Sequence, residues 1–125
     1  MNLEFEIHGG VTVIRHLDAR MDAKLAYEFA EQVKQHINAG NKSLVLDMGE
    51  VMSVDSSSLG AIVGVSKAVA PDGILVLVSV SAIVKDLFEI TRIDQVIRIA
   101  ETEQEAIELV KQGGKDSCID DLEVN

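Results

Sequence analysis

The chain opens with a two-residue hydrophobic repeat. Apolar and acidic side chains alternate over residues 3–7, which is the pattern of a strand with one exposed face. A second apolar run covers residues 11–17, and the pair Gly9-Gly10 separates the two runs. Two strands joined through a glycine pair predict a β-hairpin.

The repeat then changes to the period of a helix. From Asp22 to Ala39 apolar residues recur at every fourth position, with alanines beside them, so that one stripe of the helix is apolar. Asp22 is placed to cap the first turn, and Gly40 stands where a glycine commonly ends a helix.

Strand-length apolar runs and helical stripes alternate through the remaining sequence. We predict strands at residues 43–48, 74–80 and 95–100, and helices at residues 56–70, 83–90 and 102–112. Pro71 ends the first of these helices, Thr102 and Glu105 form a capping box at the start of the last, and Gly113 ends it. A hairpin followed by strand–helix alternation predicts an α/β fold, with a mixed central sheet of about five strands covered by about four helices.

The length of 125 residues fits one domain, and its charge restricts the partners. We assign residues 1–112 to this domain and residues 113–125 to an acidic tail that we expect to be mobile. The net charge is −10, which repels phosphate backbones and anionic lipid headgroups, so nucleic acid is not an expected partner. The charge fits a partner protein with a basic patch and fits solubility alone equally well.

No segment of the sequence predicts export, membrane insertion or metal binding. The N-terminus lacks the basic and apolar regions of a signal peptide, and the longest apolar runs are far shorter than the roughly 20 residues of a membrane helix. Cys118 is the single cysteine, so it has no internal disulfide partner. His8, His16 and His36 lack the spacing of metal ligands. We therefore expect a cytoplasmic protein without a metal or other cofactor.

Asp55 and three serines, Ser56, Ser57 and Ser58, stand between a predicted strand and a predicted helix. One such side chain suffices to cap the helix, which contributes about 1 kcal/mol, and serine is a mediocre helix former, so capping leaves the other hydroxyls unexplained. An exposed serine in a first turn could be a nucleophile or could accept a phosphoryl group. Because neither a G-x-S-x-G elbow nor a P-loop is present, the residues alone favour capping first, phosphorylation second and catalysis third.

The segment LVLDMGEVMSVDSSSLGAIVG resembles the central motif of STAS domains, the fold of bacterial anti-sigma factor antagonists. In that family a buried strand ends in Asp, and a short loop leads to Asp-Ser-Ser-Gly-Leu-Gly at the start of a helix. Asp47 ends the predicted strand here, and five positions of the motif match, namely Asp55, Ser56, Ser57, Leu59 and Gly60. Leu17-Asp18 match the end of the Gly-x-Leu-Asp segment that precedes the first helix of the family, and the order of elements agrees over residues 3–112.

The resemblance implies a phosphorylatable binding module and not an enzyme. In the family, the second serine of the motif, which is Ser57 here, is phosphorylated by a serine kinase of the histidine-kinase-like ATPase fold that is also the anti-sigma factor. The unphosphorylated antagonist binds this kinase and releases a sigma factor. Phosphorylation blocks the contact, and a PP2C-type phosphatase reverses it.

The resemblance also indicates which residues contact the partner. Asp18 and Asp55 have family counterparts beside the phosphosite, although a turn residue and an N-cap would explain them equally well. We further expect contacts from Ser56 and Ser58 and from the exposed side of the second helix, notably Lys67.

Some positions depart from the family pattern or leave alternatives open. Ser58 replaces the glycine after the double serine and becomes, with Ser56, an alternate phosphosite. Arg15 replaces the glycine of Gly-x-Leu-Asp, where it could alter partner choice, pair with a phosphate on Ser57, or be a solvated strand residue. Met48 and Met52 flank the motif loop, either as packing residues or as part of an adaptable partner surface.

Two other functions stay open at this level. STAS proteins also regulate targets other than sigma factors or sit in lipid-transport ATPase complexes, although the intact Asp-Ser-Ser favours phospho-switching. A small hydrolase or nucleotide-binding enzyme that uses Ser57 is a third candidate, and the missing base and oxyanion chemistry count against it.

Overall fold

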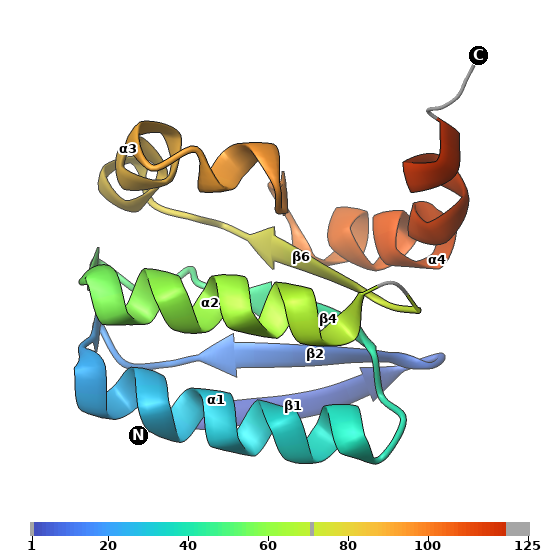
Figure 1. Cartoon of the computed structure of the whole chain (residues 1–125), viewed down its shortest axis with the longest axis horizontal. Coiled ribbons are helices and arrows are strands. Elements are labelled where there is room, and N and C mark those ends of the chain that lie inside the picture. Colours follow the sequence, from blue (N-terminus) through green and yellow to red (C-terminus); the bar gives the residue numbers. More distant parts are fainter. Residues whose placement is uncertain (1, 71, 120–125) are drawn as a thin grey trace.

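A computed structural model describes residues 2–70 and 72–119, with side chains as far as residue 112. Five strands form the central sheet in the order β1-β2-β4-β6-β7 (Figure 1). Their bounds are β1 (Leu3–His8), β2 (Val11–His16), β4 (Ser43–Asp47), β6 (Ile74–Val78) and β7 (Arg98–Ala100). β1 pairs with β2 in antiparallel fashion, and the other three pairs are parallel. The mixed sheet with a leading hairpin is therefore confirmed.

The hairpin turn depends on two glycines. Gly9 has a φ of +57° and Gly10 a φ of +88°. Two consecutive positive φ values characterise the type I′ turn, whose twist matches that of the flanking strands, and glycine adopts them without a steric penalty. The turn fixes the register in which Leu3 lies opposite His16.

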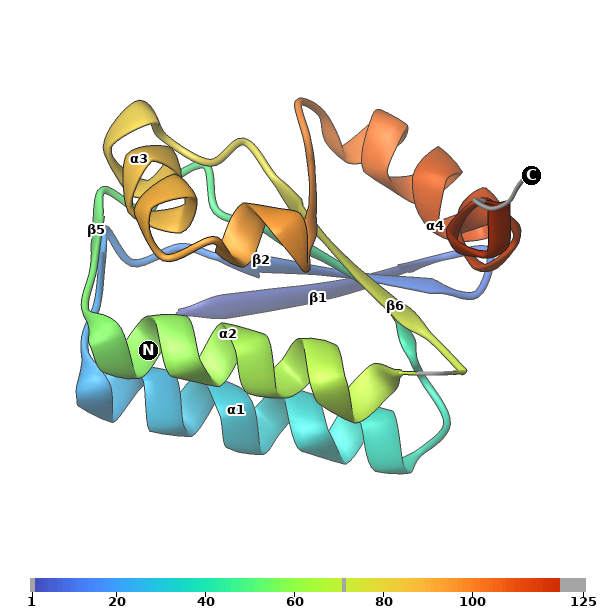
Figure 2. The same cartoon turned by 45° about the horizontal axis from the view of Figure 1, so that its top comes forward.

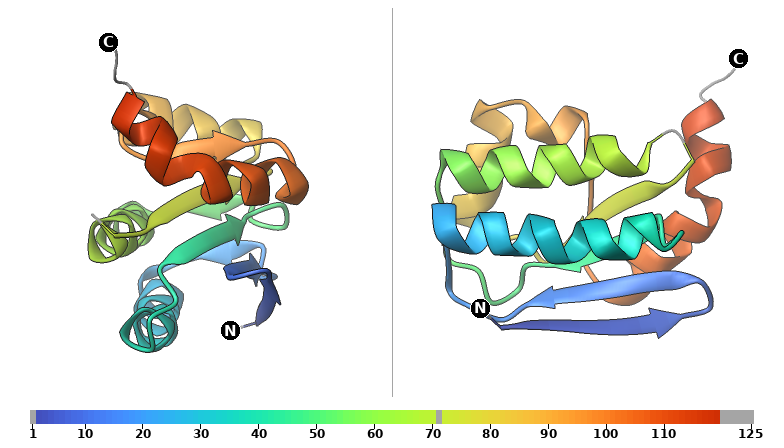
Figure 3. Two further views of the ribbon diagram at one scale, coloured as in Figure 1. Left: turned by 90° about the vertical axis from the view of Figure 1, so that its right-hand side faces the viewer. Right: turned by 60° about the horizontal axis from the view of Figure 1, so that its bottom comes forward.

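Both faces of the sheet are buried under helices. One face packs against α1 (Ala23–Asn38), α2 (Ser56–Val69), α3 (Ala82–Ile90) and the short 3-10 helix η1 (Ile93–Gln95). The opposite face packs against α4 (Glu103–Ile119), and Figure 3 shows α4 across the sheet from α1 and α2. Successive side chains of a strand alternate between these layers, so Ile14 faces the first and Val13 the second. A sheet covered on both sides explains why its central strands are continuous apolar runs.

The predicted caps are present at the helix ends. The Oδ1 atom of Asp22 accepts the backbone N–H of Leu25 at 3.0 Å, and Gly40 ends α1 with a φ of +98°. Thr102 caps α4 by accepting the N–H of Glu105 at 3.1 Å. These contacts involve neighbours in sequence, which is why local patterns predict them.

Two predicted boundaries are wrong. α4 continues through Gly113 to Ile119, because a glycine inside a helix costs only about 1 kcal/mol and does not force an end. β6 ends at Val78 and not at residue 80, because Ser79 turns to a φ of +58°. The mobile tail at residues 113–125 stays a prediction, and residues 120–125 lie outside the described part of the chain.

Within the described residues, no helix combines the length and the apolar character needed to cross a membrane.

Candidate functional site

A second, two-stranded parallel sheet joins the start of α1 to the segment before α2. It consists of β3 (Arg20–Met21) and β5 (Ser53–Val54), and the carbonyl of Ala19 accepts the N–H of Met52 at 2.7 Å. β5 lies beside the start of α2 in Figure 2. The sequence predicted only a loop for residues 49–54, because two-residue strands are too short to show alternation. The sheet holds the loop that carries Asp18 next to the motif, as the resemblance to the STAS family implied.

Asp55 is the N-cap of α2. Its Oδ1 atom accepts the backbone N–H of Ser58 at 2.9 Å and the Ser58 hydroxyl at 3.0 Å. These bonds hold the pKa of the Asp55 carboxyl below its usual range, because they stabilise the ionised form. The capping role is therefore confirmed. The carboxylate stays exposed, so capping does not remove it from the surface.

The three serines differ in exposure. Ser56 and Ser57 are exposed, whereas Ser58 is completely buried. The Ser58 hydroxyl donates a hydrogen bond to the carbonyl of Met21, on β3, as well as contacting Asp55. In this conformation Ser58 can serve neither as alternate phosphosite nor as partner contact, because a kinase or a partner reaches only a hydroxyl at the surface. The third serine of the motif therefore has a structural role, because its hydrogen bond joins α2 to β3.

The structure places the other two expected contact residues, Asp18 and Lys67, on separate parts of the surface. Asp18 accepts the backbone N–H of Asn2 at 2.8 Å, which ties the first residues of the chain to the loop beside α2. Lys67 is exposed near the C-terminal end of α2. Ten residues separate it from Ser57, which corresponds to about 15 Å along the helix axis. A partner that contacts both residues must therefore cover most of α2.

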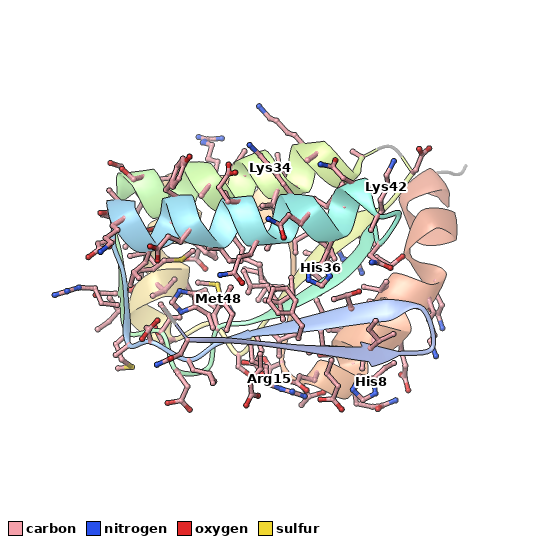
Figure 4. The ribbon with its side chains drawn as sticks, turned by 90° about the horizontal axis from the view of Figure 1, so that it is seen from below. His8, Arg15, Lys34, His36, Lys42 and Met48 are labelled. Carbon is pink, nitrogen blue, oxygen red and sulfur yellow. The ribbon has the colours of Figure 1, made fainter. Side chains whose placement is uncertain are left out.

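Arg15 lies on the face of the sheet that α4 covers, pointing away from α1 and α2 (Figure 4). Its Nε and Nη2 atoms each donate to Glu103 at 2.7 Å, and Nη1 lies 2.7 Å from Glu6. The alternative of a solvated strand residue is wrong, because carboxylates engage the guanidinium from two elements. Pairing with a phosphate on Ser57 is also wrong, because α2 packs on the opposite face.

Asp47 ends β4 beside this ion-pair cluster. Burial is the main cause that raises the pKa of its carboxyl to about 6, and a hydrogen-bond contact with Glu103 adds to it. Arg15 holds the pKa of Glu103 down to about 2. The Oδ1 atom of Asp47 accepts the N–H of Gly49 at 2.8 Å. Asp47 thereby shapes the turn that leads from the sheet into the motif loop.

The histidines are placed in the framework of the fold. His8 belongs to the hairpin, where it contacts a glutamate, and His36 stacks on a phenyl ring between α1 and β1 (Figure 4). His16 is buried in β2, which lowers its pKa, and its Nδ1 atom lies 3.3 Å from the carbonyl oxygen of Asp18. No hydrogen bond within the described residues joins a histidine to Ser57, and no cluster there could hold a metal ion.

The two methionines of the motif loop have separate roles. Met48 is 1% exposed and belongs to the core under α1 and α2 (Figure 4), so it is a packing residue. Met52 is 55% exposed beside the small sheet and remains available to a partner. Sequence reasoning could not separate them, because a single methionine carries no signal of burial.

Comparisons with known proteins agree with this arrangement. The sequence profile of the STAS domain matches residues 2–106. A Thermotoga neapolitana protein with the provisional name anti-sigma factor antagonist is 36% identical over 78 residues, which are 62% of this chain and 69% of the relative. The crystal structure of a Thermotoga maritima protein, also provisionally named an anti-sigma factor antagonist, has a TM-score of 0.79 at 28% identity and covers 87% of this chain and 94% of its own. The Bacillus cell fate determinant SpoIIAA in the phosphorylated form shares the fold, with a TM-score of 0.68 at 22% identity over 87% of this chain and 99% of its own.

Proposed function

The chain belongs to the STAS domain family and to its anti-sigma factor antagonists, which are regulators and not enzymes, and from this premise we propose that phosphorylation of Ser57 switches its binding state. Unphosphorylated, it binds in the cytoplasm a serine kinase of the histidine-kinase-like ATPase fold that is also an anti-sigma factor. Phosphorylation by that kinase breaks the contact, and a PP2C-type phosphatase restores it.

The exposure of Ser57 beside a buried Ser58 carries this proposal. Ser57 presents its hydroxyl in the first turn of α2, which the Asp55 cap and the tie from Ser58 to β3 hold in place. A kinase needs an accessible hydroxyl on a segment that it can recognise, and Ser57 meets this need without unfolding of the helix. Ser56 is also exposed, so it is the alternative that an experiment must separate.

Charge supplies the mechanism of release. A phosphoryl group adds about −1.5 to −2 charges next to the exposed Asp55 carboxylate, on a chain whose net charge is already −10. The positive end of the α2 dipole favours an anion at this position, by roughly 0.3–1 kcal/mol for a charged side chain. The helix therefore keeps its fold when Ser57 is modified, and the effect falls on the partner that packs against it.

The partner surface follows from what is exposed around Ser57. Asp18 lies on the loop that the small sheet holds beside α2. Asp55 and Ser56 directly precede Ser57, Met52 lies a few residues earlier in the chain, and all three are exposed. Lys67 marks the far end of the same helix. This surface combines two carboxylates with an apolar methionine, and a phosphoryl group on Ser57 places both bulk and charge inside the packed contact that a partner makes with it.

Phosphopeptide mapping tests the site. The protein is isolated from its native cells as wild type and as the Ser57→Ala and Ser56→Ala variants, and the modified residue is identified by mass spectrometry. We expect phosphate on Ser57 in the wild type, none in Ser57→Ala, and wild-type occupancy in Ser56→Ala. Phosphate that persists on Ser56 in the Ser57→Ala variant would contradict the assignment.

A further inference from the structure

A cleft of about 450 Å³ opens where β6 and β7 end, and the exposed serines are not among the residues that line it. It is lined by Ser79 and Val80 after β6, Lys85 on α3, Asp94 on η1, and Arg98 and Glu101 at the two ends of the β7 segment. In Figure 2 the chain between η1 and α4 runs beside the end of β6. We propose that this cleft binds a small organic phosphate whose carbon skeleton carries hydroxyl groups. The proposal does not rest on the function proposed for Ser57.

Two cations point to an anionic group. Neither Lys85 nor Arg98 forms an ion pair with any carboxylate whose side chain the structure describes. Both cations line the same cleft, so both are available to an anionic group bound there. A phosphate accepts hydrogen bonds from an ammonium and bidentate hydrogen bonds from a guanidinium. The start of α3, which follows Val80, adds its dipole to the same side.

Two acids restrict the remainder of the ligand. Asp94 and Glu101 line the same cleft, and neither carboxylate pairs with Lys85 or Arg98 at ion-pair distance. Ionised carboxylates only accept hydrogen bonds, so they favour a ligand that offers hydroxyl donors. A volume of about 450 Å³ lies in the usual range for sites that hold metabolite-sized molecules and exceeds what inorganic phosphate fills. A phosphorylated polyol or sugar satisfies charge, donors and size together.

One residue that lines the cleft has a left-handed backbone conformation. Ser79 and Arg92 are the two non-glycine residues with positive φ in the described chain, at +58° and +64°. Ser79 lines the cleft, and Arg92 begins the η1 turn that carries Asp94. The N–H of Ser79 donates to the carbonyl of Ala100 at 3.2 Å, which joins the two strand ends at the base of the cleft. Such strain persists only where surrounding contacts enforce it.

Titration of the full chain with three probes tests the proposal. Ribose 5-phosphate, ribose and inorganic phosphate are each added at millimolar concentration while backbone amide resonances are followed. We expect ribose 5-phosphate to shift resonances of residues 79–101 in a saturable way, and ribose to shift none. Inorganic phosphate should bind more weakly, because it lacks the donors that Asp94 and Glu101 accept.

Variants localise the binding. Lys85→Ala and Arg98→Ala should each weaken ribose 5-phosphate binding about tenfold or more, since each removes a charged hydrogen-bond donor. Lys24→Ala removes the charge of another exposed lysine, on α1, and should leave binding unchanged. Asp94→Asn should weaken binding of ribose 5-phosphate but not of inorganic phosphate. The proposal is overturned if no saturable shift occurs, if Lys24→Ala weakens binding as much as Lys85→Ala, or if inorganic phosphate binds as tightly as the ester.

Discussion

The hydroxyl of Ser58 joins the start of α2 to the Asp55 cap and to β3. It contacts the Asp55 cap and the Met21 carbonyl of β3, and no solvent reaches it. Ser58→Ala leaves the Met21 carbonyl without this donor, so we expect it to lower the free energy of unfolding by about 1–3 kcal/mol. Ser57→Ala is the matched control and should change it by less than about 0.5 kcal/mol. Urea unfolding of both variants compares them; equal stability would show that the tie is not needed.

The raised pKa of Asp47 makes stability depend on pH in a defined direction. Its carboxyl titrates near 6 in the folded protein instead of near 3.8, so between these values the folded state holds a proton that the unfolded state has lost. Stability from this group is therefore present below about pH 4 and is lost as the pH rises toward about 6. Asp47→Asn keeps a neutral acceptor for Gly49 and removes the titration.

The expected result is a difference between Asp47→Asn and wild type that grows with pH. The two proteins should be equally stable near pH 4, and the variant should be the more stable one near pH 7. Urea midpoints measured across this range provide the test. A difference that stays constant with pH would mean that Asp47 has an ordinary pKa in the folded protein.

Single residues were predictable from sequence where their partners are close in sequence. Asp22 and Asp55 cap helices through bonds to residues three positions away, and the sequence identifies both. Ser58 contacts a residue 37 positions earlier, and Arg15 pairs with one 88 positions later. Partners at such separation are set by the topology of the sheet, so a local pattern could not reveal them.

At the scale of elements, α4 is held on the sheet by apolar packing and by the ion pair of Arg15 with Glu103. The side chains of this pair are 26% and 25% exposed and meet in bidentate geometry. A double-mutant cycle of Arg15→Ala and Glu103→Ala should give a coupling free energy of roughly 1–2 kcal/mol, because partly buried bidentate pairs exceed fully exposed surface pairs. The coupling should decrease at high salt. A coupling near zero would leave packing as the sole attachment of α4.

The start of α2 should accept negative charge without loss of structure. Ser57→Asp places a carboxylate at the positive end of the helix dipole, so we expect its stability to equal or exceed that of Ser57→Ala by up to about 1 kcal/mol. Thermal melts of both variants at low ionic strength measure this. A Ser57→Asp protein that melts well below Ser57→Ala would indicate that phosphorylation acts by unfolding.

Elements with several turns or a clear alternation were predictable, and short ones were not. The period of α1 identified its core stripe, and the glycine pair identified the hairpin. β3 and β5, with two residues each, have no period to detect. In α3 the apolar residues predicted for helix 83–90 are only partly buried, because Val84 and Phe88 lie in the core while Ile83 and Ile90 are exposed. The apolar pattern of α3 therefore overstates how many of its side chains the core buries.

For the whole molecule, the topology places both proposed sites at the same end of the sheet. The carboxyl ends of β4 and β6 lie side by side. The motif loop follows β4, and the residues after β6 line the cleft. The order of strands and helices could be predicted because hairpins and parallel crossovers restrict the possibilities. The burial of Ser58 and the cleft beside Ser79 depend on how distant segments pack, and only the structure reveals them.

Calorimetric titration against the captured partner tests the proposed switch most directly. The Ser57→Ala protein first captures a kinase from native cells, and the purified partner is then titrated with unphosphorylated protein, phosphorylated protein, and the Ser57→Asp and Gln32→Glu variants. Gln32→Glu adds the same single negative charge as Ser57→Asp, but on the exposed side of α1, and controls for net charge. We predict that the unphosphorylated protein and Gln32→Glu bind alike, and that phosphorylation and Ser57→Asp each weaken binding about tenfold or more while the fold stays intact. A phosphorylated protein that binds as tightly as the unphosphorylated one would contradict the proposed switch.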